Sequence, residues 1–228
     1  MIKVHHLNNS RSQRILWMLE ELNQEYEIVF YERDLKTMLG PESLFNVHSL
    51  GKSPVIIDNY SGEEIIIAES GAIVEYLLHT YGRKSSLLLP KTGSKQELDY
   101  RYWLHFSEGS LMPALLLRLI FDRVKNAKVP FFVKPITKAV SNKILAEFVN
   151  PNINRLLDFI EENLKGKKWI LGNQLSGADI QMSFPLETSV SRGLINEHHP
   201  IIKSYVERIH GQPAYQDALK KGGQYDYA

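Results

Sequence analysis

The spacing of apolar residues changes several times within the first 31 residues. Residues 2–7, IKVHHL, have the two-residue alternation of a short strand. Over 13–22 the apolar residues recur instead at the spacing of one helical face, at Ile15, Leu16, Leu19 and Leu22. Residues 26–31, YEIVFY, are rich in aromatic and β-branched side chains and predict a second strand. The start of the chain therefore predicts a βαβ unit.

A second group of elements follows the loop-rich segment 36–54, which has room for one short helix. Two apolar stretches, 54–58 and 64–68, predict strands, and the polar residues 59–63 between them predict a hairpin turn. Residues 69–82 predict a helix that ends at Gly82. The predicted order is β-α-β, loop, β-β-α.

The pattern changes at residues 83–93, RKSSLLLPKTG, which read as a linker rich in Pro, Gly and Ser. After it only helical patterns follow, over about 94–125, 131–164, 178–192 and 199–210. The predicted fold class is therefore α/β followed by all-α. We expect one domain over 1–82, a linker over 83–93 and a helical domain over 94–228.

Composition narrows the class of function. The 228 residues are 43% hydrophobic and carry a net charge of +1, so the overall charge favours no nucleic-acid partner. No run of 18 apolar residues and no secretory signal are present, which favours a cytoplasmic protein. Cysteine is absent, which excludes a protein thiol as nucleophile. His5 and His6 have no partners at metal-ligand spacing, so we expect no metal and interpret both as packing residues.

Pro54 opens an apolar strand in LGKSPVII. One interpretation is an ordinary trans proline at the start of an edge strand. The other is a cis Ser53–Pro54 peptide bond, which turns the backbone groups of Ser53 outward, where they can pair with an extended peptide ligand.

Glu69 and Ser70 lie where a strand gives way to a helix, in AESGAI. Free N–H groups and the helix dipole favour an anion there, and the Ser70 hydroxyl can add a hydrogen bond. Glu69 can bind an ammonium group beside it, so together the two residues fit the head group of an α-amino acid. The alternative is local: Ser70 caps the helix and Glu69 complements its dipole.

Ser176 and Asp179 have the spacing of a capping box in QLSGADIQMSFPL. Leu175 and Ile180 flank it at the positions of a hydrophobic staple. This motif is a folding signal for a buried helix and carries no chemistry.

Together these motifs, in this order, resemble the cytosolic glutathione transferases. The segments HHLNNSRSQRILWMLEELNQEYEIVFYERD, LGKSPVI, AESGAIVEYLL and LSGADIQMSFPL are most similar to the fungal glutathione transferase I group and its bacterial relatives. The resemblance implies a thioredoxin-like domain and a helical domain. It also implies an enzyme that activates the thiol of glutathione, its co-substrate, for attack on a small hydrophobic electrophile.

Two alternatives remain within the resemblance: glutathione-dependent reduction of peroxides or disulfides, and a non-catalytic interaction protein on the same scaffold. The family also implies a homodimer.

By resemblance, Glu69 and Ser70 hold the γ-glutamyl group, and Pro54 is cis so that the Ser53 backbone meets the cysteinyl residue. Lys52 is expected to meet the glycine carboxylate, or else to be an ordinary solvated lysine.

The group that activates the thiol is expected at the first strand–helix turn, where the family uses Tyr, Ser or Cys. Cysteine is absent and no tyrosine precedes Tyr26. Serine-type members place their serine four residues before a basic residue on the first helix. That basic residue is Arg14 here, which makes Ser10 the first candidate. Ser12 is the second, and Asn9 or a backbone N–H is the third. Arg11 is interpreted as a solvated or interface residue.

The electrophile pocket is expected to be apolar and to lie between the domains. Leu7, Phe106 and Ser110 are its predicted lining, with the tail residues Tyr225 and Tyr227 within reach.

Residues 123–143 hold six Lys or Arg and no Asp or Glu, interleaved with VPFFV and PIT. Such a run is typical of a solvated helix face, and peripheral contact with a membrane surface is the second interpretation.

Overall fold

The computed structural model describes residues 1–34, 36–60 and 62–228, and the described strands form one four-stranded mixed sheet. The strands are β1 (Ile2–Leu7), β2 (Tyr26–Tyr31), β3 (Val55–Tyr60) and β4 (Glu63–Ala68). Their order is β2-β1-β3-β4, with β1 parallel to β2 and β3 antiparallel to both β1 and β4. The predicted βαβ unit and β-hairpin are confirmed. The hairpin turn is shorter than the predicted 59–63, because β3 ends at Tyr60 and β4 begins at Glu63. Ser61 lies outside the described residues.

Two helices and two short 3₁₀ turns complete the first half of the chain. They are α1 (Gln13–Glu21), η1 (Glu42–Asn46), α2 (Ser70–Tyr81) and η2 (Gly82–Lys84). Both predicted helices are confirmed, and η1 is the short helix expected within 36–54.

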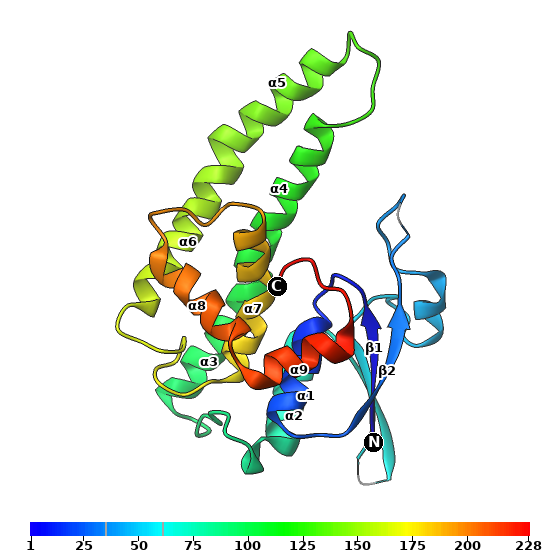
Figure 1. Ribbon diagram of the computed structural model, residues 1–228, viewed down its shortest axis with the longest axis vertical. Coiled ribbons are helices and arrows are strands. Elements are labelled where there is room, and N and C mark those ends of the chain that lie inside the picture. The colour runs from blue at the N-terminus through cyan, green and yellow to red at the C-terminus, as the bar shows by residue number, and fades with distance from the viewer. Residues whose placement is uncertain (35, 61) are drawn as a thin grey trace.

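All regular elements after residue 84 are helical within the described chain, which confirms the predicted fold class (Figure 1). They are α3 (Lys95–Phe106), η3 (Ser107–Leu111), α4 (Met112–Lys125), α5 (Lys134–Ile144), η4 (Leu145–Val149), α6 (Asn150–Leu164), α7 (Gly177–Ser191), α8 (Pro200–His210) and α9 (Pro213–Gly222). The turns η3 and η4 are π-helical, so each long predicted helix continues through a wider turn. Helix α9 was not predicted.

The register of the sheet gathers three loops at one edge. His5 of β1 lies opposite Val55, and Val55 lies opposite Ala68. The turn after β1, the Ser53–Pro54 pair before β3 and the Glu69–Ser70 pair after β4 therefore emerge side by side. Residues far apart in sequence meet there because β3 runs opposite to both neighbours.

The predicted capping box at the start of α7 is present, and its Asp179 also accepts hydrogen bonds from two other segments. Asp179 accepts hydrogen bonds from the N–H (2.9 Å) and hydroxyl (2.6 Å) of Ser176. Its other oxygen accepts from the N–H of Ile170 (2.7 Å) and the hydroxyl of Tyr205 (2.6 Å). Burial raises the pKa of Asp179, and these four donors oppose the shift. The box therefore joins α7 to α8 and to the turn before it.

One hydrophobic core runs through both halves of the chain. Helices α1 and α2 pack on α7, and α9 returns to pack on α1. There the ring of Tyr215 meets Trp17 edge-to-face at 5.4 Å. The two halves are thus held together by shared apolar contacts.

The continuous helical stretch Lys95–Lys125 is long and apolar enough to cross a membrane by length and composition, and 33% of its most apolar window is buried. Core helices of soluble proteins meet the same criteria, so this stretch alone does not indicate a membrane span.

Both histidines of β1 are buried, as predicted for packing residues. His6 Nε2 is 3.1 Å from the carbonyl oxygen of Gly222, which can only accept, so Nε2 carries the proton. His6 Nδ1 then accepts from the hydroxyl of Ser12 at 2.9 Å. Burial lowers the pKa of His6 to about 4, so the ring is neutral near pH 7.

We predict that His6 makes the protein sensitive to mild acid. In the unfolded chain the pKa of His6 returns to 6.5. Between pH 6.5 and 4 only the unfolded state therefore takes up the proton, and stability falls as the pH falls through that window. At pH 5 the loss is about 2 kcal/mol relative to pH 7.

Urea unfolding of the wild type and of His6→Phe at the two pH values measures this effect. The variant should lose less stability on acidification, because the other titrating groups are common to both proteins. Equal acid sensitivity would show that His6 is not the responsible group.

Candidate functional site

A cleft of about 320 Å³ lies at the edge of the sheet where the three loops meet. Its lining is Leu50, Lys52, Ser53, Pro54, Ala68, Glu69 and Ser70 from the first half, with Arg11 and Glu108 beside them. Five predicted binding residues, 52–54 and 69–70, are thus brought together. The two charged residues Arg11 and Glu108 were not predicted to take part.

The N-terminus of α2 opens into this cleft without a side-chain cap. Glu69 is the N-cap residue, and its side chain makes no capping hydrogen bond. Its backbone has φ +67°, a left-handed conformation that is unfavourable for a residue with a side chain. Such strained positions cluster at ligand-binding sites. The exposed Glu69 carboxylate and the first N–H groups of α2 are therefore available to a ligand.

The hydroxyl of Ser70 is buried at the same helix end. Its oxygen accepts a short hydrogen bond from Arg14 Nη2 and a longer one, 3.4 Å, from Gln181 Nε2. Because both lone pairs are engaged, the hydroxyl hydrogen is left to donate. Ser70 is thus held as a hydrogen-bond donor, as an anionic ligand requires.

The Ser53–Pro54 peptide bond is cis, as the resemblance implied. The hydroxyl of Ser53 donates to the carbonyl of His5 at 2.8 Å and accepts from the N–H of Leu7 at 3.2 Å. Its side chain therefore ties the start of β3 to β1, and any ligand contact at Ser53 falls to the backbone. Lys52, next to it, is exposed at the cleft.

Arg14 is a fully buried cation behind the cleft. Its guanidinium donates to the carbonyl of Gln181 at 2.5 Å and to Glu108 Oε1 at 2.6 Å, besides Ser70. Burial lowers the pKa of Arg14, and the charge of Glu108 opposes that shift. Burial by itself would raise the pKa of Glu108, but the charges of Arg14 and Arg11 outweigh it and lower the pKa. The two groups form an ion pair behind the cleft.

Arg11, interpreted from the sequence as a solvated or interface residue, joins the first turn to η3. Its Nε donates to Glu108 Oε2 at 2.9 Å, and its guanidinium lies 5.6 Å from the ring centroid of Phe184. It also lines the cleft at the first turn. The spacing of Arg11 and Arg14, three residues apart, could have shown that both cations lie on one side of the turn. Nothing local marks Glu108 as their shared partner.

Ser10 and Ser12, the first two candidates for thiol activation, are buried and bonded within the turn. Ser10 Oγ donates to the carbonyl of Leu7 at 2.7 Å and lies 2.8 Å from Ser12 Oγ. Ser12 in turn bonds to His6. Neither serine is among the residues lining the cleft.

Asn9, the third candidate, is held by the C-terminal tail. Its amide donates to Asp226 Oδ2 at 2.7 Å and accepts from the N–H of Asp226 at 2.8 Å. Tyr225, which precedes Asp226 in the tail, donates to the buried carboxylate of Glu187 at 2.6 Å. The tail therefore fixes the first turn from outside, and both ends of the Asn9 amide are occupied.

The predicted lining of an electrophile pocket is not assembled as expected. Phe106 is buried in an aromatic cluster with Tyr102, Trp103 and Phe159, so its assignment to the pocket is corrected to the helical core. Leu7 is buried and is not among the residues lining the cleft, and Ser110 is exposed on η3.

Two aromatic side chains that were not predicted to meet lie near Arg11. Phe184 of α7 contacts Tyr227 of the tail edge-to-face at 5.7 Å, and the guanidinium of Arg11 lies over its ring.

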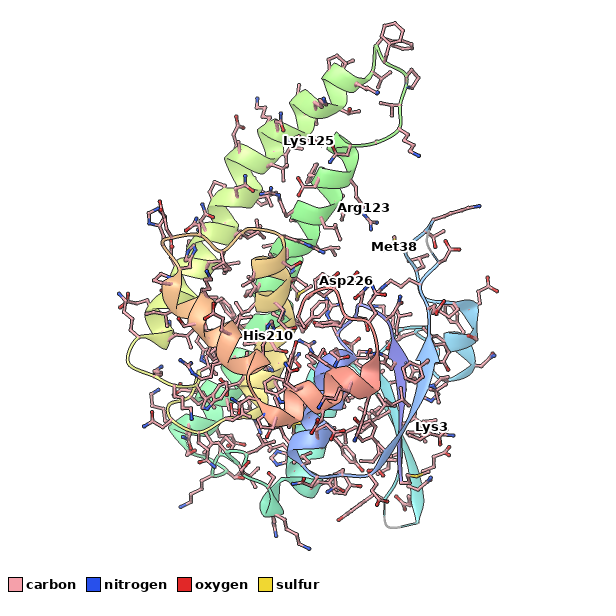
Figure 2. The ribbon with its side chains drawn as sticks, viewed as in Figure 1. Lys3, Met38, Arg123, Lys125, His210 and Asp226 are labelled. Carbon is pink, nitrogen blue, oxygen red and sulfur yellow. The ribbon has the colours of Figure 1, made fainter. Side chains whose placement is uncertain are left out.

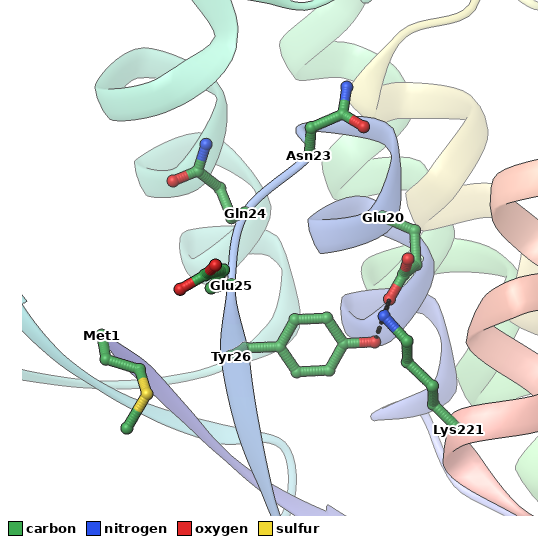
Figure 3. A pocket seen from close by; sticks show the side chains of 7 residues that line it. All are labelled: Met1, Glu20, Asn23, Gln24, Glu25, Tyr26 and Lys221. Atoms are coloured by element: carbon green, nitrogen blue, oxygen red, sulfur yellow. Dashed lines mark hydrogen bonds and ion pairs between the residues drawn. The ribbon is translucent and has the colours of Figure 1, made fainter.

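A second surface cavity lies between α1, β2 and α9 (Figure 3). There the carboxylate of Glu20 accepts from the hydroxyl of Tyr26 and from Nζ of Lys221, both at 2.5 Å. These groups satisfy one another and attach α9 to the first βαβ unit, so this cavity is structural. Across the described chain no group of three or more His, Cys, Asp or Glu is placed to hold a metal ion.

Comparison with known proteins shows the family to which the chain belongs. Residues 1–79 match the model of the glutathione S-transferase N-terminal domain, and residues 121–213 match that of the C-terminal domain. Glutathione S-transferase 1 of Saccharomyces cerevisiae is 35% identical over 97% of this chain and 95% of its own. The disulfide-bond oxidoreductase YfcG of Escherichia coli is 25% identical over 97% of this chain and 95% of its own.

Solved structures agree with the sequences. A glutathione S-transferase from Actinobacillus pleuropneumoniae superimposes with a TM-score of 0.79 at 33% identity, covering 100% of this chain and 95% of its own. A glutathione transferase homologue from Lodderomyces elongisporus, solved with two glutathione molecules per subunit, has the same fold at 21% identity and a TM-score of 0.75, covering 96% of this chain and 98% of its own. The chain therefore belongs to the glutathione S-transferase family.

Proposed function

We propose that the protein is a glutathione transferase that binds glutathione in the cleft and activates its thiol for conjugation to an electrophilic organic substrate. The observation that carries the proposal is the N-terminus of α2. A buried hydroxyl held as a donor and an exposed carboxylate that makes no cap lie there side by side. This is the pair of groups that an α-amino acid head group needs.

In this proposal the other two residues of glutathione lie along the cleft. With the γ-glutamyl carboxylate at Ser70 and its ammonium at Glu69, the extended tripeptide runs past the backbone of Ser53 as an added strand does. The glycine carboxylate then lies toward Lys52, the exposed cation at that end. Glutathione is a co-substrate in this proposal, and no metal takes part.

The chemical step needs the thiolate. A free thiol has a pKa near 8.5, and lowering it by about two units requires about 2.7 kcal/mol of preferential stabilisation of the charged sulfur. Arg11 is the cation at the first turn that lines the cleft, and we assign it the main share of that stabilisation. Its partner Glu108 keeps the guanidinium in place, while the N-terminus of α1 adds a smaller term. The thiol proton leaves to water, and the thiolate attacks the electrophile.

Ser10 remains the second candidate. Its hydroxyl would have to leave the carbonyl of Leu7, 2.7 Å away, in order to donate to the sulfur. Ser12 would have to break its bond to His6. Both moves forfeit a buried hydrogen bond, whereas the Arg11 guanidinium has further N–H donors besides the Nε–H that it gives to Glu108.

Reduction of peroxides or disulfides by glutathione is the alternative function, and similarity to the oxidoreductase YfcG favours it. A glutathione thiolate can perform that reaction in a chain without cysteine. We further propose a cytoplasmic homodimer acting on a small hydrophobic electrophile, by analogy with the family.

The first prediction is that the protein is retained on immobilised glutathione and turns over a model aryl halide. Glu69→Gln should raise the KM for glutathione about tenfold or more, with kcat little changed, because it removes a charge from the ammonium site. Glu64→Gln, an exposed substitution on β4, is the matched control and should leave KM unchanged.

Failure to bind glutathione would contradict the transferase and the reductase alike. Turnover of cumene hydroperoxide or of a glutathione mixed disulfide, without turnover of the aryl halide, would favour the reductase. An unchanged KM in Glu69→Gln would remove that carboxylate from the binding site.

The second prediction concerns the thiol. Arg11→Leu should raise the pKa of bound glutathione by about one unit or more, since it removes the cation nearest the sulfur. Arg11→Lys should restore part of the shift. Ultraviolet absorbance of the thiolate, followed against pH in the binary complex, measures it directly.

Ser10→Ala should change that pKa less than Arg11→Leu does, and Arg101→Leu on the exposed face of α3 is the control for loss of a surface arginine. A large shift in Ser10→Ala with none in Arg11→Leu would return the role to the serine.

A further inference from the structure

The last six residues of the chain return to the first turn, the segment 8–12 between β1 and α1. Residues 223–228, all of which the structure describes, contain no helix or strand. They leave α9 beside β1 and pass toward α7 (Figure 1). In the view of Figure 2, Asp226 lies between Met38, in the loop after β2, and His210 of α8. The chain end therefore lies where the two halves of the protein meet.

The tail is anchored before it reaches Asp226. The carbonyl of Gly222, at the end of α9, accepts from Nε2 of the buried His6 at 3.1 Å. The hydroxyl of Tyr225 donates to the buried carboxylate of Glu187 at 2.6 Å. Because both anchors are buried groups, the position of Asp226 is set by the core of the protein rather than by its own exposed side chain.

Asp226 and Asn9 exchange two hydrogen bonds. The Asn9 amide donates to Asp226 Oδ2 at 2.7 Å and accepts from the N–H of Asp226 at 2.8 Å. The other carboxylate oxygen accepts from Gln224 Nε2 at 2.9 Å, which keeps Oδ2 turned to Asn9. Asn9 has φ +48°, a left-handed conformation that asparagine adopts more readily than most residues. The tail thus holds the first turn at its least common backbone conformation.

The first turn depends on such contacts from other segments. Within the described chain, the backbone N–H groups of residues 9–11 donate to no backbone carbonyl. The turn is held instead by side chains, among them that of Asn8, which accepts from the N–H of Arg33 at 3.0 Å. Arg11 follows Asn9 by two residues, so the path of the turn decides where its guanidinium points.

The tail also supports the side chain of Arg11. The rings of Tyr225 and Tyr227 meet edge-to-face at 5.3 Å, and Tyr227 meets Phe184 in the same way at 5.7 Å. The guanidinium of Arg11 lies 5.6 Å from the ring centroid of Phe184. Both the backbone that precedes Arg11 and the ring under its guanidinium are therefore in contact with the tail.

We propose that Asp226 is a positioning residue for thiol activation: by holding Asn9 it fixes the first turn and keeps the Arg11 guanidinium directed at the glutathione sulfur. This inference rests on the proposed function, in which Arg11 stabilises the thiolate. A purely electrostatic role would have the opposite sign. A carboxylate near the sulfur disfavours the thiolate, so its removal would lower the pKa of the thiol, whereas loss of the position of Arg11 raises it.

The pKa of the bound glutathione thiol, followed by ultraviolet absorbance, tests this role. Asp226→Ala should raise it by about half a unit, which lowers the thiolate fraction about threefold at a pH below the pKa. The kcat should fall to the same extent with KM for glutathione little changed, since the γ-glutamyl group is bound at α2. Asp226→Asn keeps an acceptor oxygen for Asn9 and should not raise the pKa. Asp217→Ala, which removes an exposed carboxylate of α9, is the matched control and should leave the pKa unchanged.

A double-mutant cycle shows whether Asp226 acts through Asn9. In an Asn9→Ala background, Asp226→Ala should have no further effect on the thiol pKa, because the contact is already lost. An effect of undiminished size there would overturn the proposal. So would a lowered pKa in Asp226→Ala, or a shift of equal size in Asp226→Asn.

Hydrogen exchange of the unliganded protein supplies a readout that needs no glutathione. The bonded N–H groups of Asn8, Ser12 and Gln13 border the turn, and in Asp226→Ala they should exchange severalfold faster. The urea midpoint should stay unchanged, and Asp226→Asn should exchange as the wild type does. Unchanged exchange in Asp226→Ala would overturn the hold of the tail on the turn. Faster exchange in a protein that binds no glutathione would contradict the proposed function and the role at the thiol, while supporting that hold.

Discussion

The site depends on the buried guanidinium of Arg14. A charge removed from water must be paired and hydrogen-bonded, because an unpaired one costs several kcal/mol. Arg14 meets this demand with partners from three elements: Ser70 at the start of α2, the carbonyl of Gln181 in α7, and Glu108 in the π-turn η3. Helix α1 is thereby joined to α2 and to two elements of the helical half. The same contact that holds the two halves together sets the orientation of the Ser70 hydroxyl.

Glu108 extends this constraint to the chemistry. One of its oxygens pairs with Arg14 and the other with Arg11, so a single carboxylate fixes both the buried cation and the one at the cleft. The π-turn that carries Glu108 widens the long helix at that point, as such turns commonly do at functional sites. Around this centre, the backbone of Glu69 is strained and the tail holds Asn9 by two hydrogen bonds. The first turn is thus fixed from inside by Arg14 and Ser12 and from outside by Asp226.

The features that could be predicted from the sequence are those that depend on residues close together in the chain. The strands, the first two helices, the capping box at Ser176 and the pairing of Glu69 with Ser70 all follow from local periodicity and from residue types at element ends. The cis bond at Pro54 came from family resemblance and could not be separated from a trans bond by local pattern.

The features that were missed depend on contacts between distant segments. Arg11 was interpreted as a solvated or interface residue, and its partner could not be named, because Glu108 is 97 positions away. Phe106 was assigned to a pocket because an aromatic residue on a helix has the same local signature in a pocket as in a core. Helix α9 is short, and its pattern became meaningful only through packing on α1.

The most direct measurement is a crystal structure of the complex with glutathione sulfonate, whose sulfonate takes the place of the thiolate. The γ-glutamyl carboxylate should accept hydrogen bonds from Ser70 and the first N–H groups of α2, with the ammonium on Glu69. The sulfonate should lie within hydrogen-bonding distance of the Arg11 guanidinium, with Arg14 still paired to Glu108. A ligand that lies in the cleft in the opposite direction, or a sulfonate bound to Ser10 with Arg11 turned to solvent, would contradict this arrangement.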